Sequence, residues 1–172
     1  MMYQHTILWV NYTTYDVRWA QDTINPKTDH CDILLLSQTE CGRNMTIHKF
    51  QYAQVLGIYH VNFIYNEPTT HQYQTHWMDF LWVRYFEVIQ PNVSGWSTSL
   101  LDQLQFHPLN SANAFGFVDP AQVLQECHII PKFSLRKWSR DNIVVVSVQA
   151  NSAQDWVRYY TNRSAKLTQG WP

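Results

Sequence analysis

The sequence is poor in charged residues, and the charges that it has nearly cancel. Charged residues make up 15% of the 172 residues, well below the roughly 25% of ordinary soluble domains. Lys and Arg number 12 and Asp and Glu number 13, which gives a formal net charge of -1. No global positive field therefore attracts the chain to nucleic acid, and any contact with DNA must be local.

Long apolar runs and paired cysteines are also missing. The longest apolar run, residues 143–146, is far shorter than the roughly 20 residues that cross a bilayer. Residues 1–5 lack the basic and apolar regions of a signal peptide. Cys31, Cys41 and Cys127 are odd in number and irregularly spaced, which favours reduced thiols over a disulfide framework. These absences predict an intracellular protein.

Aromatic residues are abundant, at 15% of the chain, and this excess favours a well-buried β fold. Apolar and β-branched residues predict strands at residues 7–15, 32–37, 50–65, 78–89, 127–130 and 142–148. Residues 78–89 carry apolar side chains on both faces and so predict a central strand. Residues 154–162 fit a helix or a strand. The polar stretches 21–30, 38–49 and 67–76 predict loops.

Two local signals refine this fold. Gly57, in the middle of residues 50–65, predicts a bulge or sharp bend that lets one strand serve two sides of a small barrel. Asp119, Pro120 and Gln122 form a capping-box variant that predicts a short helix over residues 120–125. The expected fold is mainly β (α+β), with a small, partly open β-barrel and one or two short helices. We expect a core over residues 1–133 and a C-terminal strand or helix appendage over residues 134–172.

The pattern of metal ligands and nucleophiles favours no catalytic centre. The pairs His30–Cys31 and Cys127–His128 could suggest zinc, but neighbours on a strand point to opposite faces. No nucleophile elbow, P-loop or dinucleotide fingerprint occurs. We therefore predict no catalytic residue, no metal and no cofactor. The alternative is a metal-dependent nuclease or transposase fragment, whose carboxylates would come from Asp16, Asp32, Asp79, Glu87 and Asp119.

One local segment, residues 132–140, interleaves cations with aromatic residues. Such a segment can contact phosphates while its rings stack on bases, although a solvated linker has the same composition. The candidate binding residues are Lys132, Arg136, Lys137, Trp138 and Arg140.

The aromatic surplus also allows a cage for a methylated ammonium group, with core packing as the alternative reading. The cage candidates are Tyr52, Tyr59, Trp82, Tyr85 and Phe86. Arg84 lies among these apolar residues, so we expect it to pair with an acid, such as Asp79, Glu87 or Asp119.

Several blocks of the sequence resemble the C-terminal region of large basidiomycete proteins associated with transposons of the Plavaka or Kyakuja-Dileera-Zisupton type. The blocks, in order, are residues 10–18, 21–26, 32–37, 52–61, 79–86, 114–120 and 127–133. The resemblance implies an accessory module outside the catalytic portion of such proteins. Residues 52–58 and 83–86 are more loosely similar to two strands of bromo-adjacent-homology domains, which is an analogy of fold only.

These observations lead to the hypothesis of a noncatalytic module of a fungal mobile-element protein, located in the nucleus. Its expected partner is chromatin, DNA or another protein. A purely structural domain of a longer polypeptide is the remaining alternative, and a large exposed apolar patch beside the chain ends would favour it.

Overall fold

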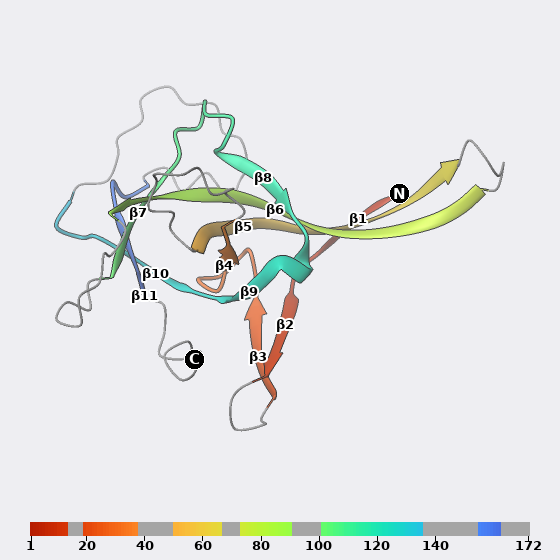
Figure 1. The fold of residues 1–172 in the computed structure, drawn as a ribbon, viewed down its shortest axis with the longest axis horizontal. Coiled ribbons are helices and arrows are strands. Elements are labelled where there is room, and N and C mark those ends of the chain that lie inside the picture. Colours follow the sequence, from red (N-terminus) through yellow and green to blue (C-terminus); the bar gives the residue numbers. More distant parts are fainter. Residues whose placement is uncertain (14–18, 38–49, 67–72, 91–100, 136–154, 163–172) are drawn as a thin grey trace, which may run out of the picture.

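The structure is a computed structural model that describes residues 1–13, 19–37, 50–66, 73–90, 101–135 and 155–162 (Figure 1). It confirms the predicted class, a mainly β fold with a barrel-like sheet. The strands are β1 (Met2–His5), β2 (Leu8–Thr13), β3 (Trp19–Ile24), β4 (Asp32–Leu36), β5 (Phe50–Asn66), β6 (Tyr73–Gln90), β7 (Asp102–Phe106), β8 (Phe115–Val118), β9 (Val123–Glu126), β10 (His128–Pro131) and β11 (Tyr159–Asn162), and a 3-10 helix, η1, spans Pro120–Gln122.

One antiparallel sheet curls until its two ends almost meet. Its strand order is β10-β11-β7-β6-β5-β4-β9, with β1 added to β5 and β8 added to β6. The strands at the two ends of this path, β9 and β10, are consecutive in the sequence and are separated only by Cys127. One bent stretch of chain therefore reaches both ends of the sheet and nearly closes it into a barrel.

The two longest strands, β5 and β6, belong to the barrel at one end and extend away from it at the other. β5 and β6 pair along their length, from Ala53 with Tyr85 to Asn66 with Tyr73, and the register shifts between Val55 and Gly57. This shift confirms the irregularity predicted at Gly57. Beyond it, β5 and β6 project from the body with β1 beside them (Figure 1). We call this three-stranded projection the arm.

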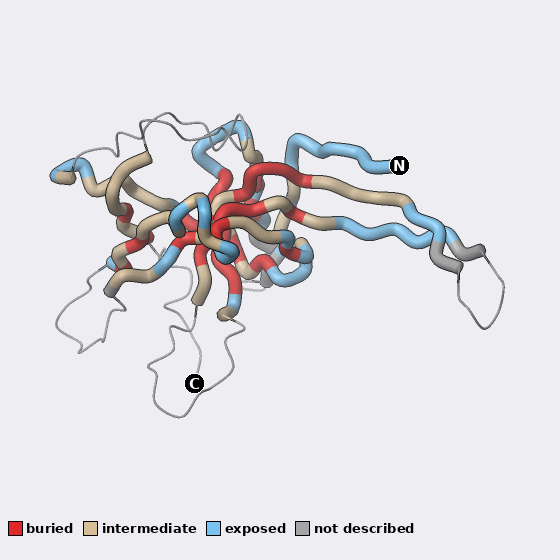
Figure 2. Tube along the Cα trace, turned by 90° about the horizontal axis from the view of Figure 1, so that it is seen from above, coloured by how far each residue is buried: buried red, intermediate tan, exposed pale blue. Residues whose placement is uncertain are grey.

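Each face of the sheet within the body is covered by a different set of side chains. One cluster contains Ile33, Val55 and Leu81, with Leu8 and Val10 of β2 packed on it. The other contains Leu34, Tyr52, Phe86, Leu104 and Tyr159. The alternating residues of β4 therefore bury both of its faces, and β4 reads in the sequence as a continuous apolar run. Figure 2 shows the buried residues in the body and the exposed ones toward the end of the arm.

The sequence assigned several boundaries wrongly. Residues 21–24, the start of the loop predicted at residues 21–30, belong to β3, which pairs with β2. The turn itself lies at Asn25, whose N–H donates to the His30 carbonyl at 2.8 Å. Residues 73–76, the end of the loop predicted at residues 67–76, extend β6 along β5. In both cases cross-strand pairing outweighs the polar composition that signalled a loop.

The predicted helix after Asp119 is shorter than expected. Asp119 does cap it, since its Oδ1 accepts a hydrogen bond from the Ala121 N–H at 2.8 Å, and Pro120 occupies the first position. The helix ends at Gln122, however, because Val123 begins β9 and pairs with Leu35 of β4.

The last described strand settles the choice between helix and strand for part of residues 154–162. β11 lies between β7 and β10 in the sheet, so residues assigned to a C-terminal appendage pair with strands of the predicted core. The strand predicted at 142–148 and the loop predicted at 38–49 lie outside the described residues. No helix in the described part of the chain is long and apolar enough to cross a membrane.

Candidate functional site

The structure describes only the beginning of the basic segment. Lys132 follows β10, its N–H donates to the carbonyl of Arg158 at 2.9 Å, and its Nζ lies 5.3 Å from the centre of the Tyr160 ring. The cationic residues Lys132 and Arg158 thus lie on neighbouring stretches of chain. The other candidates of this segment lie outside the described residues: Arg136, Lys137, Trp138 and Arg140.

The five candidate cage residues do not surround a common point. Tyr52 and Phe86 are buried, with exposed fractions of 0% and 4%, and the Tyr52 hydroxyl donates to Asp102 Oδ2 at 2.8 Å. Tyr85 packs on the opposite face of the sheet, where its ring covers Gly116. Tyr59 and Trp82 are partly exposed and share one face, whereas Tyr85, also partly exposed, lies on the other.

Arg84 pairs with an acid that the sequence reasoning did not name. Its Nη2 donates to Asp155 Oδ2 at 2.9 Å, and the two side chains are 1% and 10% exposed. The Arg84 guanidinium also lies 3.7 Å above the centre of the Phe106 ring. Arg84 does pair with an acid, as expected, but Asp79, Glu87 and Asp119 were the wrong candidates, because the partner lies just before β11, in a stretch remote in sequence.

The three rejected acids have other partners. Asp79 Oδ1 accepts from Trp77 Nε1 at 2.8 Å, Glu87 Oε2 accepts from Gln105 Nε2 at 3.0 Å, and Asp119 caps η1. Asp16 lies outside the described residues. Within the part of the chain that the structure describes, no three His, Cys, Asp or Glu side chains gather as a metal site.

The two described thiols are buried. Desolvation, followed by the nearby Asp32 charge, raises the pKa of Cys31 to about 12. The same two causes raise the pKa of Cys127 well above its usual value. Both thiols therefore stay protonated near neutral pH, and protonated thiols are poor nucleophiles and poor metal ligands.

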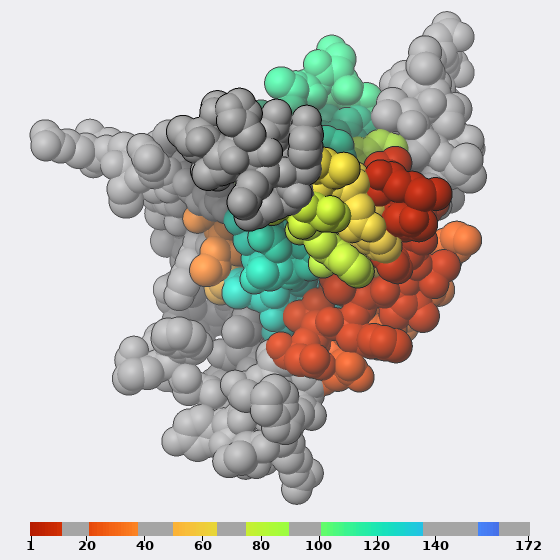
Figure 3. All heavy atoms as spheres, turned by 90° about the vertical axis from the view of Figure 1, so that its right-hand side faces the viewer, coloured from red at the N-terminus to blue at the C-terminus, as the bar shows by residue number. Residues whose placement is uncertain are grey.

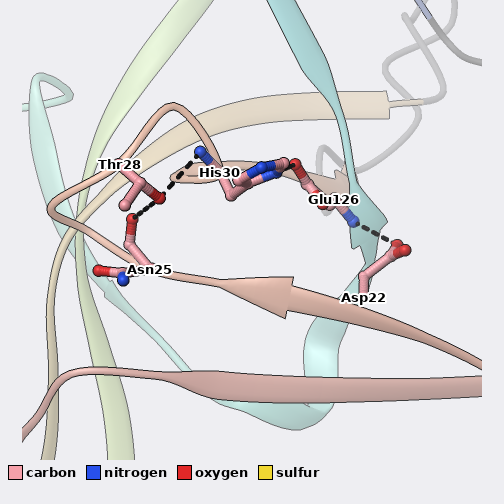
Figure 4. A network of polar contacts seen from close by, with 5 residues as sticks. All are labelled: Asp22, Asn25, Thr28, His30 and Glu126. Atoms are coloured by element: carbon pink, nitrogen blue, oxygen red, sulfur yellow. Dashed lines mark hydrogen bonds and ion pairs between the residues drawn. The ribbon is translucent and has the colours of Figure 1, made fainter.

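A polar network joins the β3–β4 turn to β9 (Figure 4). His30 Nδ1 lies 2.6 Å from Glu126 Oε1, and Asp22 Oδ2 accepts from the Glu126 N–H at 3.0 Å. The hydrogen bond with Glu126, and then its charge, raise the pKa of His30. Asn25 and Thr28 fold the turn so that the His30 N–H meets Thr28 Oγ1 at 3.3 Å. These contacts anchor the β2–β3 hairpin to the barrel.

The most distinctive surface lies on one face of the arm, and the sequence analysis missed it as a unit. Partners opposite each other in antiparallel strands place their side chains on the same face. Met2 opposes Val61, which opposes Met78, and Tyr59 opposes Phe80. We call this surface the apolar arm face; it comprises Met2, Tyr59, Val61, Phe63, Met78, Phe80, Trp82 and Phe117.

Ring contacts organise the part of the apolar arm face nearest the body. Tyr59 stacks on Phe80 with ring centres 5.5 Å apart, and Phe80 meets Phe117 edge to face, also at 5.5 Å. Gly57 makes room for this arrangement, because a Cβ there would lie 2.5 Å from Tyr59 Cε2. The alternation of apolar residues along β5 and β6 was the sequence signal for this face. Whether the face is exposed depends on where the neighbouring strands end.

Comparison with known proteins gives no match to this chain. No protein-family model matches it, and no curated protein and no solved structure is significantly similar to it. The resemblance to transposon-associated proteins stays a prediction.

Proposed function

We propose that this chain is a noncatalytic interaction module that binds a protein partner through the apolar arm face. The observation that carries the proposal is the exposure of large apolar side chains on this face: 73% for Phe117, 63% for Met2, 50% for Met78 and 40% for Phe63. Apolar side chains gathered on one exposed surface mark interaction sites in soluble proteins. Burial of such side chains by a partner supplies the main driving force of association.

The charge of the arm favours a protein over nucleic acid. Residues 57–81 include two acids, Glu67 and Asp79, and neither Lys nor Arg. Binding to DNA or RNA draws most of its affinity from cations that neutralise phosphates. Residues 57–81 offer no Lys or Arg, so a protein partner suits the arm better than nucleic acid.

The wider biological setting belongs to the same proposal. The resemblance of residues 10–133 to an accessory region supports a role in placing a fungal mobile-element protein on chromatin in the nucleus. The separate partners of Asp79, Glu87 and Asp119 support a noncatalytic module, because a nuclease needs carboxylates that converge on its metal ions.

Two other roles remain as alternatives, each with its own observation. Lys132 and Arg158 lie on neighbouring stretches of chain, which favours a local phosphate contact. The exposed apolar side chains of the arm face would also suit a structural domain that packs against further polypeptide.

Binding of the chain to duplex DNA and to histone-tail peptides, unmodified and methylated, tests the proposal when measured by fluorescence anisotropy across a salt series. We expect peptide binding that changes little with salt. The variant Met78→Lys should lose this binding, because a charge then replaces an apolar contact. A preference for methylated peptides would assign Tyr59 and Trp82 to recognition of the ammonium group.

Ile64→Lys provides the matched control. Ile64 is 65% exposed on the same arm, one residue beyond Phe63 and hence on the opposite face. The Ile64→Lys variant should bind the histone-tail peptides as the unmodified chain does. DNA binding that weakens steeply with salt and depends on Lys132 would replace the proposal by the phosphate-binding role. Absence of binding to both probes would favour the structural domain.

A further inference from the structure

Two histidines meet on the face of the arm opposite the apolar arm face. His5 of β1 and His60 of β5 bring Nε2 and Nδ1 to within 2.5 Å. The ring centres are 4.7 Å apart, so the two nitrogens point toward each other.

Flat rings hold His60 in this orientation. Tyr3 stacks on His60 with centres 4.7 Å apart, and Trp77 stacks on it at 4.6 Å. The strand register fixes the backbone positions, since Tyr3 opposes His60 and His60 opposes Asp79. The pair therefore lies on a three-stranded scaffold rather than on a loop.

Both nitrogens are of the kind that binds transition metals. Unprotonated imidazole nitrogen is the commonest protein ligand for these ions. Two metal–nitrogen bonds of about 2.0–2.1 Å, at a square-planar or tetrahedral angle, separate the nitrogens by about 2.8–3.4 Å. The pair must therefore open from 2.5 Å by roughly 0.3–0.9 Å, and both rings must turn so that the two nitrogens aim at the ion rather than at each other.

The surroundings suit a cation. Asp79 opposes His60 across β5 and β6, and Trp77 Nε1 fixes its carboxylate through a bond of 2.8 Å to Oδ1. Residues 57–81 carry neither Lys nor Arg, so they contribute no positive side chain to repel a metal. No third His, Cys, Asp or Glu joins the pair among the described residues, so water would have to complete the coordination of an ion there.

We propose that His5 and His60 form a two-imidazole site for a divalent transition-metal ion, which clamps β1 onto the arm. Each imidazole binds as the neutral tautomer that leaves its facing nitrogen unprotonated. The affinity should follow the order Zn²⁺ or Ni²⁺ below Cu²⁺.

The test is a calorimetric titration of the full chain with NiCl₂ near neutral pH. We expect saturable binding of one Ni²⁺, and we expect His5→Gln and His60→Gln each to weaken it by at least about tenfold, since even an outer partner of a metal ligand is worth about 10–100-fold. His76→Gln is the matched control, because His76 lies on the same arm, opposite Phe63 on the apolar arm face. It should bind Ni²⁺ as the unmodified chain does.

A second readout tests the clamp itself. Ni²⁺ should slow amide hydrogen exchange at Met2–His5 in the unmodified chain and in His76→Gln, and should leave it unchanged in His5→Gln and His60→Gln. The proposal is overturned if the unmodified chain shows no saturable binding, or if either His5→Gln or His60→Gln retains full affinity. Unchanged exchange at Met2–His5 in Ni²⁺-loaded protein would overturn the clamp.

Discussion

The body and the arm are built from the same two strands, yet their side chains lie in opposite environments. In the body, Leu81 and Val83 of β6 are both 0% exposed, whereas Met78, only three residues before Leu81, is 50% exposed. The apolar character of β6 changes little between these positions. What changes is the number of neighbouring strands: β8 and β7 pair with β6 from Leu81 onward, while β1 is the described strand added to the arm.

This difference separates two uses of apolar side chains. Those in the body are covered by the chain itself and stabilise the fold. Those on the apolar arm face are exposed, and we propose that they bind a partner. Single substitutions can therefore separate the two regions by their effect on the free energy of unfolding.

The largest effect is expected for Arg84→Met in the body. Removing one member of a buried ion pair leaves the other charge unpaired and typically costs about 3–5 kcal/mol. Both Arg84 and Asp155 are nearly fully buried, so chemical denaturation should show a loss of this size. The double variant Arg84→Met with Asp155→Leu should recover part of it, since the buried carboxylate is then removed as well. Stability equal to that of the unmodified chain would show that the pair is solvated.

A matched pair of truncations on β6 should give the next largest difference. Leu81→Ala removes a side chain from the buried cluster and should cost about 2–5 kcal/mol. Met78→Ala removes an exposed side chain and should change the free energy of unfolding by about 0.5 kcal/mol or less. Equal losses in urea denaturation would mean that the arm belongs to the folding core.

A smaller and pH-dependent effect is expected at Asp32. Burial, then the charges of Glu126 and Asp29, raise the pKa of this carboxyl well above its usual value. The folded state then binds more protons than the unfolded state, so stability falls as the pH rises above about 4, the ordinary pKa of Asp. Asp32→Asn should remove this loss, at about 1.4 kcal/mol for each unit by which the pKa is raised.

Thermal melts across a pH series check the sign of the Asp32 effect. Asp32→Asn should melt higher than the unmodified chain near neutral pH, and both should melt together below about pH 4, where the carboxyl is neutral in both states. A variant that melts lower near neutral pH would show that the charge of Asp32 is stabilising.

Much of the fold was predictable from local sequence patterns. The cross-strand pairing that decides where each strand begins and ends was not. Strong β-branched and aromatic runs predicted β4, β5 and most of β6, and Gly57 predicted the irregularity in β5. β3 was missed because polar residues such as Gln21 and Asp22 dominate it. Asp22 is nevertheless buried, since its carboxylate accepts from the N–H of Glu126, a contact between residues far apart in sequence.

The same limit applies to the sites. Sequence pattern identified Arg84 as a structurally important residue, but its partner Asp155 comes from a stretch 71 positions away. The His5–His60 contact joins residues 55 positions apart and has no signature in either neighbourhood. Proximity of this kind follows from register, which a single sequence does not specify.

The central claim is that the apolar arm face acts in binding and not in folding. One variant, Met78→Lys with Phe117→Lys, tests it when its melting temperature and its binding to the histone-tail peptides are measured on the same sample. We expect the melting temperature to stay within a few degrees of the unmodified chain, because exposed substitutions change stability by about 0.5 kcal/mol each, while peptide binding is lost. A fall in melting temperature like that of Leu81→Ala, or peptide binding that survives both charges, would contradict the claim.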